Sequence, residues 1–193
     1  MREAWTFGKN KSALISLTAL LVGGGCLVTD SALAGTQGQS SVTKKSDGTE
    51  IVKNANGSSV ETRADGTKIV RNADKSSVET RKNGTQIVTN PDGSSIEVLP
   101  NGTKIVRNAD GSSMEMRKDH TTIVKNADGS GEDTLPDGTT ITRNRDGSSV
   151  EKKKDGTVIV VNSDHSSEQI NPDGSKNITN ADGSKAFIKG RSK

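Results

Sequence analysis

The residues of this chain that could bind a cation are acids that recur beside glycine at a fixed spacing. Asp or Asn precedes every ninth position from Gly48 onward, and that ninth position is Gly at most sites. Oxygen-rich loops of this kind suit Ca²⁺, but an EF-hand loop placed on Gly129 would have Val124 at its first ligand position and Leu135 at its last. The spacing excludes an EF-hand and leaves weak cation binding along the turns as an alternative.

The two histidines, His120 and His165, both stand where the repeat otherwise has Gly. The order of the repeat units places them at opposite edges of the predicted fold, where they cannot share a metal ion or transfer a proton to one substrate. The abundant serines have no neighbouring His and buried acid to activate them. We therefore predict no catalytic, metal or cofactor site, and a protein that is not an enzyme.

The composition excludes a core of ordinary thickness. From Gly35 to Lys193, Leu, Ile, Val and Phe make up 27 of 159 residues, about 17%, and Phe187 is the single aromatic residue. An aromatic-lined cofactor pocket cannot be built from these residues. The net charge of +3 is too small to hold the chain open by self-repulsion, and too small, without stacking aromatics, for nucleic-acid binding.

The first 34 residues have the order of a secretory signal. A basic segment between Arg2 and Lys11 precedes an apolar run, and Ala32-Leu33-Ala34 ends the segment with the small-x-small pattern of a cleavage site. The apolar run is shorter than a transmembrane helix requires. We predict cleavage after Ala34 and a secreted or periplasmic protein; a lipoprotein anchored through Cys26 is the alternative.

The predicted mature chain has three parts and no transmembrane segment. Residues 35–45 are polar and without periodicity, which predicts a flexible lead-in. The repeat predicts a β-domain over residues 46–188, and residues 189–193 form a disordered tail.

The repeat predicts a turn in every nine residues. All four prolines lie two positions before the repeated Gly, as in Asn90-Pro91-Asp92-Gly93. Proline favours the first central position of a type I turn, and Gly then takes the left-handed conformation of a three-residue hairpin loop with a G1 bulge. The remaining six residues form a strand, so the chain is an all-β, single-layer, open antiparallel meander of about fifteen or sixteen strands.

Two unit types alternate, so that the full period is 18 residues. With a three-residue loop, Val70 lies opposite Val78, and Val88 lies opposite Ile96. One face then carries an apolar stripe, and the other face carries Ile alternating with acids that Lys and Arg flank. The stripe is a candidate binding surface, and it comprises Val52, Val60, Val70, Val78, Val88, Ile96, Val106, Met114 and Val124. Glu132 and Thr142 interrupt it, and Val150 and Val160 resume it.

The pattern Asp-Gly-Thr-x-Ile-Val-x-Asn-Pro-Asp-Gly-Ser resembles the glycine-rich G-box repeats of the T-complex protein 10 C-terminal domain, over roughly residues 46–187. The resemblance implies a long, open, single-layer antiparallel sheet, and some family members bind a proline-containing peptide of a partner on one face. This chain departs from the family because it has no aromatic residues along most of its strands and begins with a secretory leader.

These features predict a structural scaffold or macromolecule-binding surface whose partner is a protein or a second copy of the chain. The alternative function is the binding of ions or of an anionic surface polymer by the turn edges. One edge is basic, through Arg63, Arg81, Lys82, Arg117, Lys118, Lys152, Lys153 and Lys154.

Overall fold

The computed structural model describes residues 40–190, which divide into two compact units at Pro100 and Asn101. The predicted signal peptide, the lead-in up to residue 39 and residues 191–193 of the predicted tail lie outside the described residues. Every element of the described part is a β-strand, so the all-β prediction is confirmed. That part contains no helix long and apolar enough to span a membrane.

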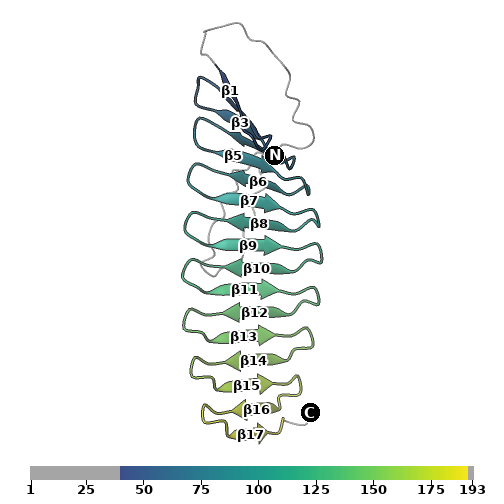
Figure 1. Cartoon of the computed structure of the whole chain (residues 1–193). Coiled ribbons are helices and arrows are strands. Elements are labelled where there is room, and N and C mark those ends of the chain that lie inside the picture. Colours follow the sequence, from purple (N-terminus) through teal and green to yellow (C-terminus); the bar gives the residue numbers. More distant parts are fainter. Residues whose placement is uncertain (1–39, 191–193) are drawn as a thin grey trace, which may run out of the picture. The chain divides into compact units, whose positions relative to one another are not determined.

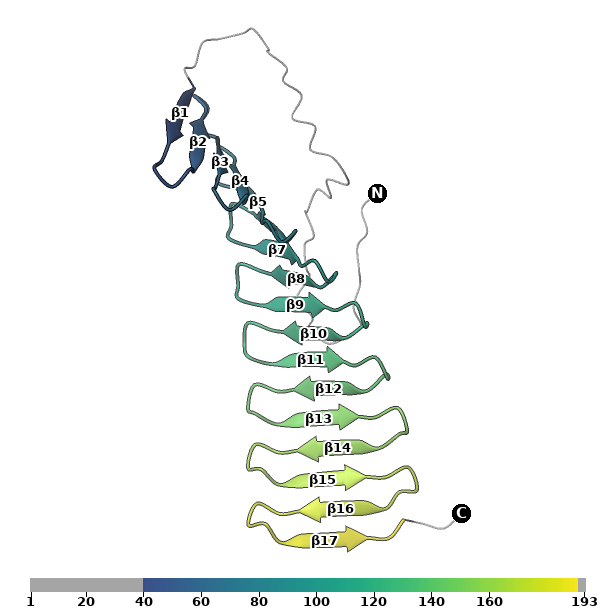
Figure 2. The same ribbon diagram turned by 45° about the vertical axis from the view of Figure 1, so that its right-hand side comes forward.

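The first unit is a meandering sheet in which each strand pairs antiparallel with the next strand along the chain (Figure 1). Every strand has four residues, and in Figure 2 the strands nearest the N-terminus are seen as one layer. The strands are β1 (Ser41–Lys44), β2 (Glu50–Lys53), β3 (Ser59–Thr62), β4 (Lys68–Arg71), β5 (Ser77–Thr80), β6 (Gln86–Thr89) and β7 (Ser95–Val98).

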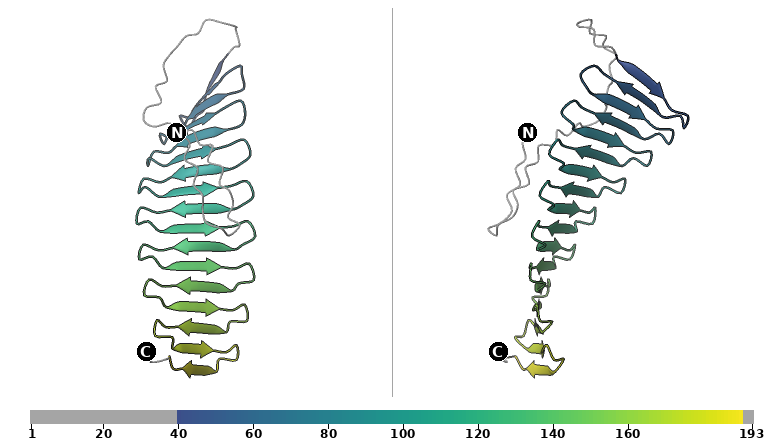
Figure 3. Two further views of the ribbon diagram at one scale, coloured as in Figure 1. Left: turned by 180° about the vertical axis from the view of Figure 1, so that it is seen from behind. Right: turned by 60° about the vertical axis from the view of Figure 1, so that its left-hand side comes forward.

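The second unit repeats the same architecture with four-residue strands and sequential antiparallel pairing. The right-hand view of Figure 3 shows its green strands nearly edge-on and in one layer. The strands are β8 (Lys104–Arg107), β9 (Ser113–Met116), β10 (Thr122–Lys125), β11 (Gly131–Thr134), β12 (Thr140–Arg143), β13 (Ser149–Lys152), β14 (Val158–Val161), β15 (Ser167–Ile170), β16 (Lys176–Thr179) and β17 (Lys185–Ile188).

The turns have the predicted geometry. In the turn between β6 and β7, the Gly93 N–H donates to the Asn90 carbonyl at 3.0 Å, and Gly93 has a φ of 86°. The Asn90 N–H donates in turn to the Ser94 carbonyl at 2.8 Å, which closes the bulge. This left-handed φ is the reason for Gly at the repeated site, because a Cβ disfavours it. The two flanking residues share a backbone bond, so each predicted six-residue strand is a four-residue ladder with one bonded residue at each end.

Turns on one edge also pack on one another. An added Cβ on Gly84 would lie 4.0 Å from the Pro100 ring, and one on Gly156 would lie 3.9 Å from the Pro172 ring. Each proline therefore covers the glycine of the preceding turn on its edge, so proline both presets its own turn and fills space beside its neighbour.

The predicted register is confirmed. Val70 pairs with Val78 and Val88 pairs with Ile96. Because side chains alternate between faces along a strand, this register places the Val residues on one face and the Ile and Glu residues on the other.

The sheet begins earlier than residue 46. Residues 41–44 fall in the predicted flexible lead-in, but they form β1, in which Val42 pairs with Val52. The segment Gln39-Ser40-Ser41-Val42 matches the Gly-Ser-Ser-Val unit with Gln in the place of Gly. The strand completes the apolar pairing of β2, although all four of its residues are exposed.

The described residues bury few apolar side chains. Ile69, Val106 and Met114 are the buried hydrophobic residues, and Val78 in the middle of the first unit remains 39% exposed. A single layer leaves the remaining apolar residues in partial contact with water, so cross-strand pairs and turn hydrogen bonds must supply much of the stability.

Candidate binding faces of the sheet

The apolar stripe lies in register within each unit. In the first unit the paired residues run from Val52 to Ile96, and in the second unit Val106, Met114 and Val124 continue the same pattern. Glu132 and Thr142 pair with each other within the row, where the sequence predicts the interruption, and Val150 and Val160 follow. The structure thus confirms the alignment of the stripe, and its role in binding stays a prediction.

A ladder of polar side chains flanks the stripe at one edge. Asn72 donates from Nδ2 to the Ser76 hydroxyl at 2.8 Å, and that hydroxyl donates to Asp74 Oδ1 at 2.6 Å. The Ser76 N–H also donates to this oxygen, at 2.9 Å. The same arrangement recurs with Asn54, Asn90, Asn108, Asn126, Asn144, Asn162 and Asn171. The prediction that these acids cap their own turns is confirmed.

Capping fixes the charge state of the acids. The Ser76 hydroxyl and then the Ser76 N–H lower the pKa of Asp74, and at the other edge the Thr67 N–H is the main cause of the lowered pKa of Asp65. Within residues 40–190, no group of three His, Cys, Asp or Glu residues is placed to hold a metal ion. Each capping carboxylate instead serves the turn that carries it.

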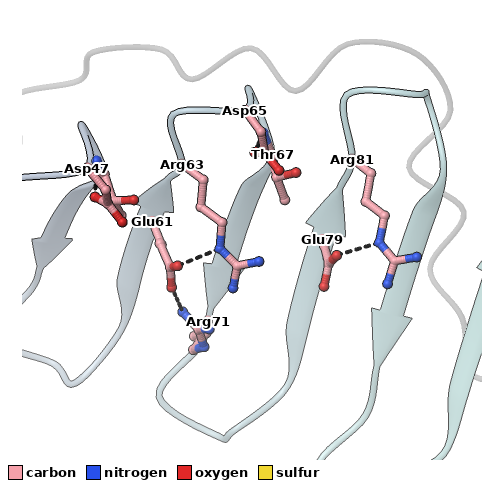
Figure 4. Close-up of polar contacts among 9 residues, drawn as sticks. Asp47, Glu61, Arg63, Asp65, Thr67, Arg71, Glu79 and Arg81 are labelled. Atoms are coloured by element: carbon pink, nitrogen blue, oxygen red, sulfur yellow. Dashed lines mark hydrogen bonds and ion pairs between the residues drawn. The ribbon is translucent and has the colours of Figure 1, made fainter. Parts of the chain in front are cut away.

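The opposite face pairs acids with bases (Figure 4). Glu61 accepts from Arg63 Nε and from Arg71 Nη1, each at 2.8 Å, and Glu79 accepts from Arg81 Nε at 2.7 Å. The Arg63 bond, followed by the Arg71 bond, lowers the pKa of Glu61 to about 2. The predicted neutralisation of this acidic row by flanking Lys and Arg is confirmed.

These ion pairs also engage part of the basic edge. Arg63, Arg81, Arg117 and Lys153 each pair with a glutamate two residues earlier in the chain. Their positive charge is thus partly neutralised by their own sheet, which reduces the attraction that the edge can exert on an anionic polymer.

One acid of this face lacks a complete set of partners. Asp133 is 8% exposed, and its Oδ2 accepts from Arg143 Nη2 at 2.6 Å. Its Oδ1 is buried without a hydrogen-bond partner. Our sequence analysis did not single out this residue, although a signal was present: Leu135 stands where other units place the paired base.

The histidines serve as turn residues. His120 and His165 have φ values of 70° and 68°, and their N–H groups close their turns on the carbonyls of Arg117 and Asn162. One turn follows the odd strand β9 and the other follows the even strand β14, so they lie at opposite edges of the second unit. The structure does not bring the two side chains together.

Comparison with known proteins supports the fold. No protein-family model and no curated protein matches the chain. The solved G-box domain of the microcephaly protein CPAP is similar with a TM-score of 0.55 at 24% identity, over 79% of this chain and 100% of that one. The TCP10 domain of Danio rerio CPAP has a TM-score of 0.50 at 22% identity, over 77% and 93%. The chain therefore has the fold of these domains, and the resemblance in its repeats is confirmed at that level.

The TCP10 domain of Danio rerio CPAP has also been solved in complex with a peptide of Danio rerio STIL. That structure is 26% identical, over 79% of this chain and 100% of that one, with a TM-score of 0.36. So loose a superposition locates no binding residue here, and any site has to come from this chain's own residues.

Proposed function

We propose that this protein is an exported, non-enzymatic scaffold whose open sheet binds another macromolecule through the apolar stripe. The observation that supports this best is the register of the stripe together with its exposure: paired Val residues follow one another across the first unit, and Val78 is 39% exposed. A contiguous apolar row that no layer covers is typical of an interaction surface.

A protein is the partner class that fits the stripe, because one apolar side chain per strand presents a narrow row rather than a pocket for a small ligand. The proposal agrees with the TCP10 domain of Danio rerio CPAP, which has been solved with a STIL peptide. A second copy of this chain is the other macromolecule that the same row would accommodate.

The test is a pull-down with mature chain, residues 35–193, from the native envelope or medium. The stripe variant carries Val78→Thr and Val88→Thr; Thr142 already occupies this row in β12, so Thr is compatible with the strand. The control carries Ile51→Thr and Ile87→Thr on the opposite face. We expect a specific protein to be retained by the wild type and the control but not by the stripe variant. Equal retention by the stripe variant would exclude the stripe as the binding surface.

Export is proposed from the leader sequence. In the native host, a C-terminally tagged chain should reach the periplasm or medium, and its N-terminal residue by mass spectrometry should be Gly35. A mature chain that begins at a lipidated Cys26 would replace this proposal with membrane anchoring, and a full-length cytoplasmic chain would exclude both.

A further inference from the structure

Strand β11 departs from the repeat on both faces. Glu132 stands in the row of Val residues, and Asp133 stands where most of the equivalent strands have Glu. Asp133 combines near-complete burial with one oxygen, Oδ1, that has no donor, while Oδ2 is held by Arg143. A buried carboxylate oxygen without a donor costs stability, so this position asks for a partner from outside the strand.

The missing donor has an identifiable cause. In the strand two before it, Glu115 accepts from Arg117 Nε at 2.6 Å, and the base lies two residues after the acid on the same face. The corresponding residue after Asp133 is Leu135, which has no donor. Asp is also one methylene shorter than Glu, so its two oxygens cannot spread to two bases as those of Glu61 do.

The surroundings of Asp133 are apolar and locally acidic. Ile123 and Ile141 are its cross-strand neighbours on either side. Residues 122–143 contain two bases (Lys125, Arg143) and four acids (Asp128, Glu132, Asp133, Asp137), so 2 − 4 gives −2, although the whole chain carries +3. This segment is therefore complementary to a cationic group with an apolar stem.

We propose that Asp133 is the docking point for an arginine side chain of the protein partner, an inference that rests on the proposed function and adds a contact on the face opposite the stripe. The guanidinium donates to Oδ1, and its aliphatic stem packs against Ile123, Ile141 and Leu135. Arginine suits the site better than lysine because a guanidinium is more weakly hydrated than an ammonium and sheds water more readily beside aliphatic side chains.

The direct test is a titration of the mature chain with N-acetyl-argininamide, followed by methyl NMR of Ile and Leu residues. We expect salt-sensitive shifts confined to the methyls of Ile123, Ile141 and Leu135, at probe concentrations up to about 100 mM, as suits a single charge-assisted contact. The uncharged isostere N-acetyl-citrullinamide should produce no such shifts. Absence of shifts with the arginine probe, or equal shifts with citrulline, would overturn the proposal.

The double variant Asp133→Glu with Leu135→Arg recreates the pair that Glu115 and Arg117 already form, so it satisfies the acid from within the sheet and should fold. We expect it to be at least as stable as the wild type and to bind the probe at least about tenfold more weakly. Glu132→Val restores the apolar row on the other face and should leave the probe shifts unchanged. Undiminished binding by the double variant would contradict a role for Asp133.

The partner from the pull-down separates this inference from the proposed function. Loss of that partner from both the stripe variant and the double variant supports both proposals. Retention by the double variant with loss from the stripe variant keeps the scaffold function and rejects the arginine contact.

Discussion

A positive φ at the end of every turn is the demand that each repeat makes on a single residue. Gly meets it at most sites, whereas Lys75, His120 and His165 adopt the same conformation, with φ values of 74°, 70° and 68°. A side chain in this region is strained by its own Cβ. The neighbouring Asp or Asn makes the turn specific, because its side-chain oxygen accepts the N–H two residues on.

Replacing either histidine with Gly should stabilise the protein. His120→Gly and His165→Gly each relieve a left-handed φ without removing a side-chain hydrogen bond of the turn, and each should raise the free energy of unfolding by about 0.5–1 kcal/mol. Thermal unfolding followed by circular dichroism measures the change. Gly66→Ala is the reciprocal control: an added Cβ meets nothing within 4 Å, so a loss of about 1–2 kcal/mol there reports backbone strain alone. Unchanged melting temperatures in all three variants would contradict this account of the turns.

The lowered pKa of Glu61 predicts acid sensitivity. Its pKa falls from 4.5 to about 2 because the folded state holds the charged form with Arg63 and then Arg71. A group whose pKa is depressed by folding contributes stability above its unfolded pKa and loses that stability as the pH falls through its folded pKa. The melting temperature should therefore be level down to about pH 5 and decline between about pH 4.5 and 2.

The Glu61→Gln variant serves as the matched comparison for this titration. It should lie below the wild type at pH 7 and approach it at pH 2, because the wild-type carboxylate has by then lost its charge. The capping acids add to the decline in both proteins, since the hydroxyl or N–H donors of their turns lower their pKa as well. A constant difference between the two proteins at all pH values would exclude the ion pairs as its cause.

At the scale of the strand, the sequence determines most of what the structure contains. Turn chemistry placed Val70 opposite Val78, and the structure confirms that register. Strand β1 was missed because Gln39 hides the turn signal, so the count began at Gly48. The unpaired Asp133 could not be read from residue types alone, because burial of one oxygen depends on how neighbouring side chains settle around it. Periodicity predicts which residues share a face, and departures from periodicity need coordinates.

Strand β11 provides a case in which restoring the repeat should be harmful. Ser occupies the first strand position in the equivalent strands β9 and β13, but β11 has Gly131. A Cβ on Gly131 would lie 2.3 Å from the Val124 carbonyl oxygen, which is backbone and cannot move aside freely. Gly131→Ser should therefore destabilise the protein by about 1–3 kcal/mol. Ser149→Gly is the comparison, with an expected loss of at most about 1 kcal/mol, and greater stability of the Gly131→Ser variant would show that β11 can adopt the common backbone.

At the scale of the whole molecule, each strand depends on its neighbours in the chain, as in other linear repeats, so stability should be close to a sum of adjacent pairings. The pairings are not all equivalent, because the two strand types carry Val and its partner at different distances from the turn. The true unit is therefore the pair of strands, 18 residues long, rather than the nine-residue turn and strand. This distinction separates the length of chain that can be removed from the length that cannot.

Deletions of one and two strands from the first unit test this directly. Removal of residues 66–83 joins Asp65 to Gly84, keeps a turn and keeps the alternation of strand types. Removal of residues 84–92 joins Asn83 to Gly93 and also keeps a turn, but it brings β5 against β7, so that Val78 faces Glu97 and Glu79 faces Ile96. Every later Val in the unit then moves to the acidic face, because the side chain period is two.

We expect the 18-residue deletion to unfold cooperatively with a melting temperature within a few degrees of the parent, and the nine-residue deletion to be the less stable despite losing fewer residues. Each mismatched cross-strand pair costs about 0.2–1 kcal/mol, and the loss should spread along the strands that change face. Amide exchange resolved by segment would locate that loss in residues 93–98, next to the new junction. If the shorter deletion proved as stable as the longer one, the two strand types would be interchangeable, and the apolar stripe would have no part in holding the sheet together.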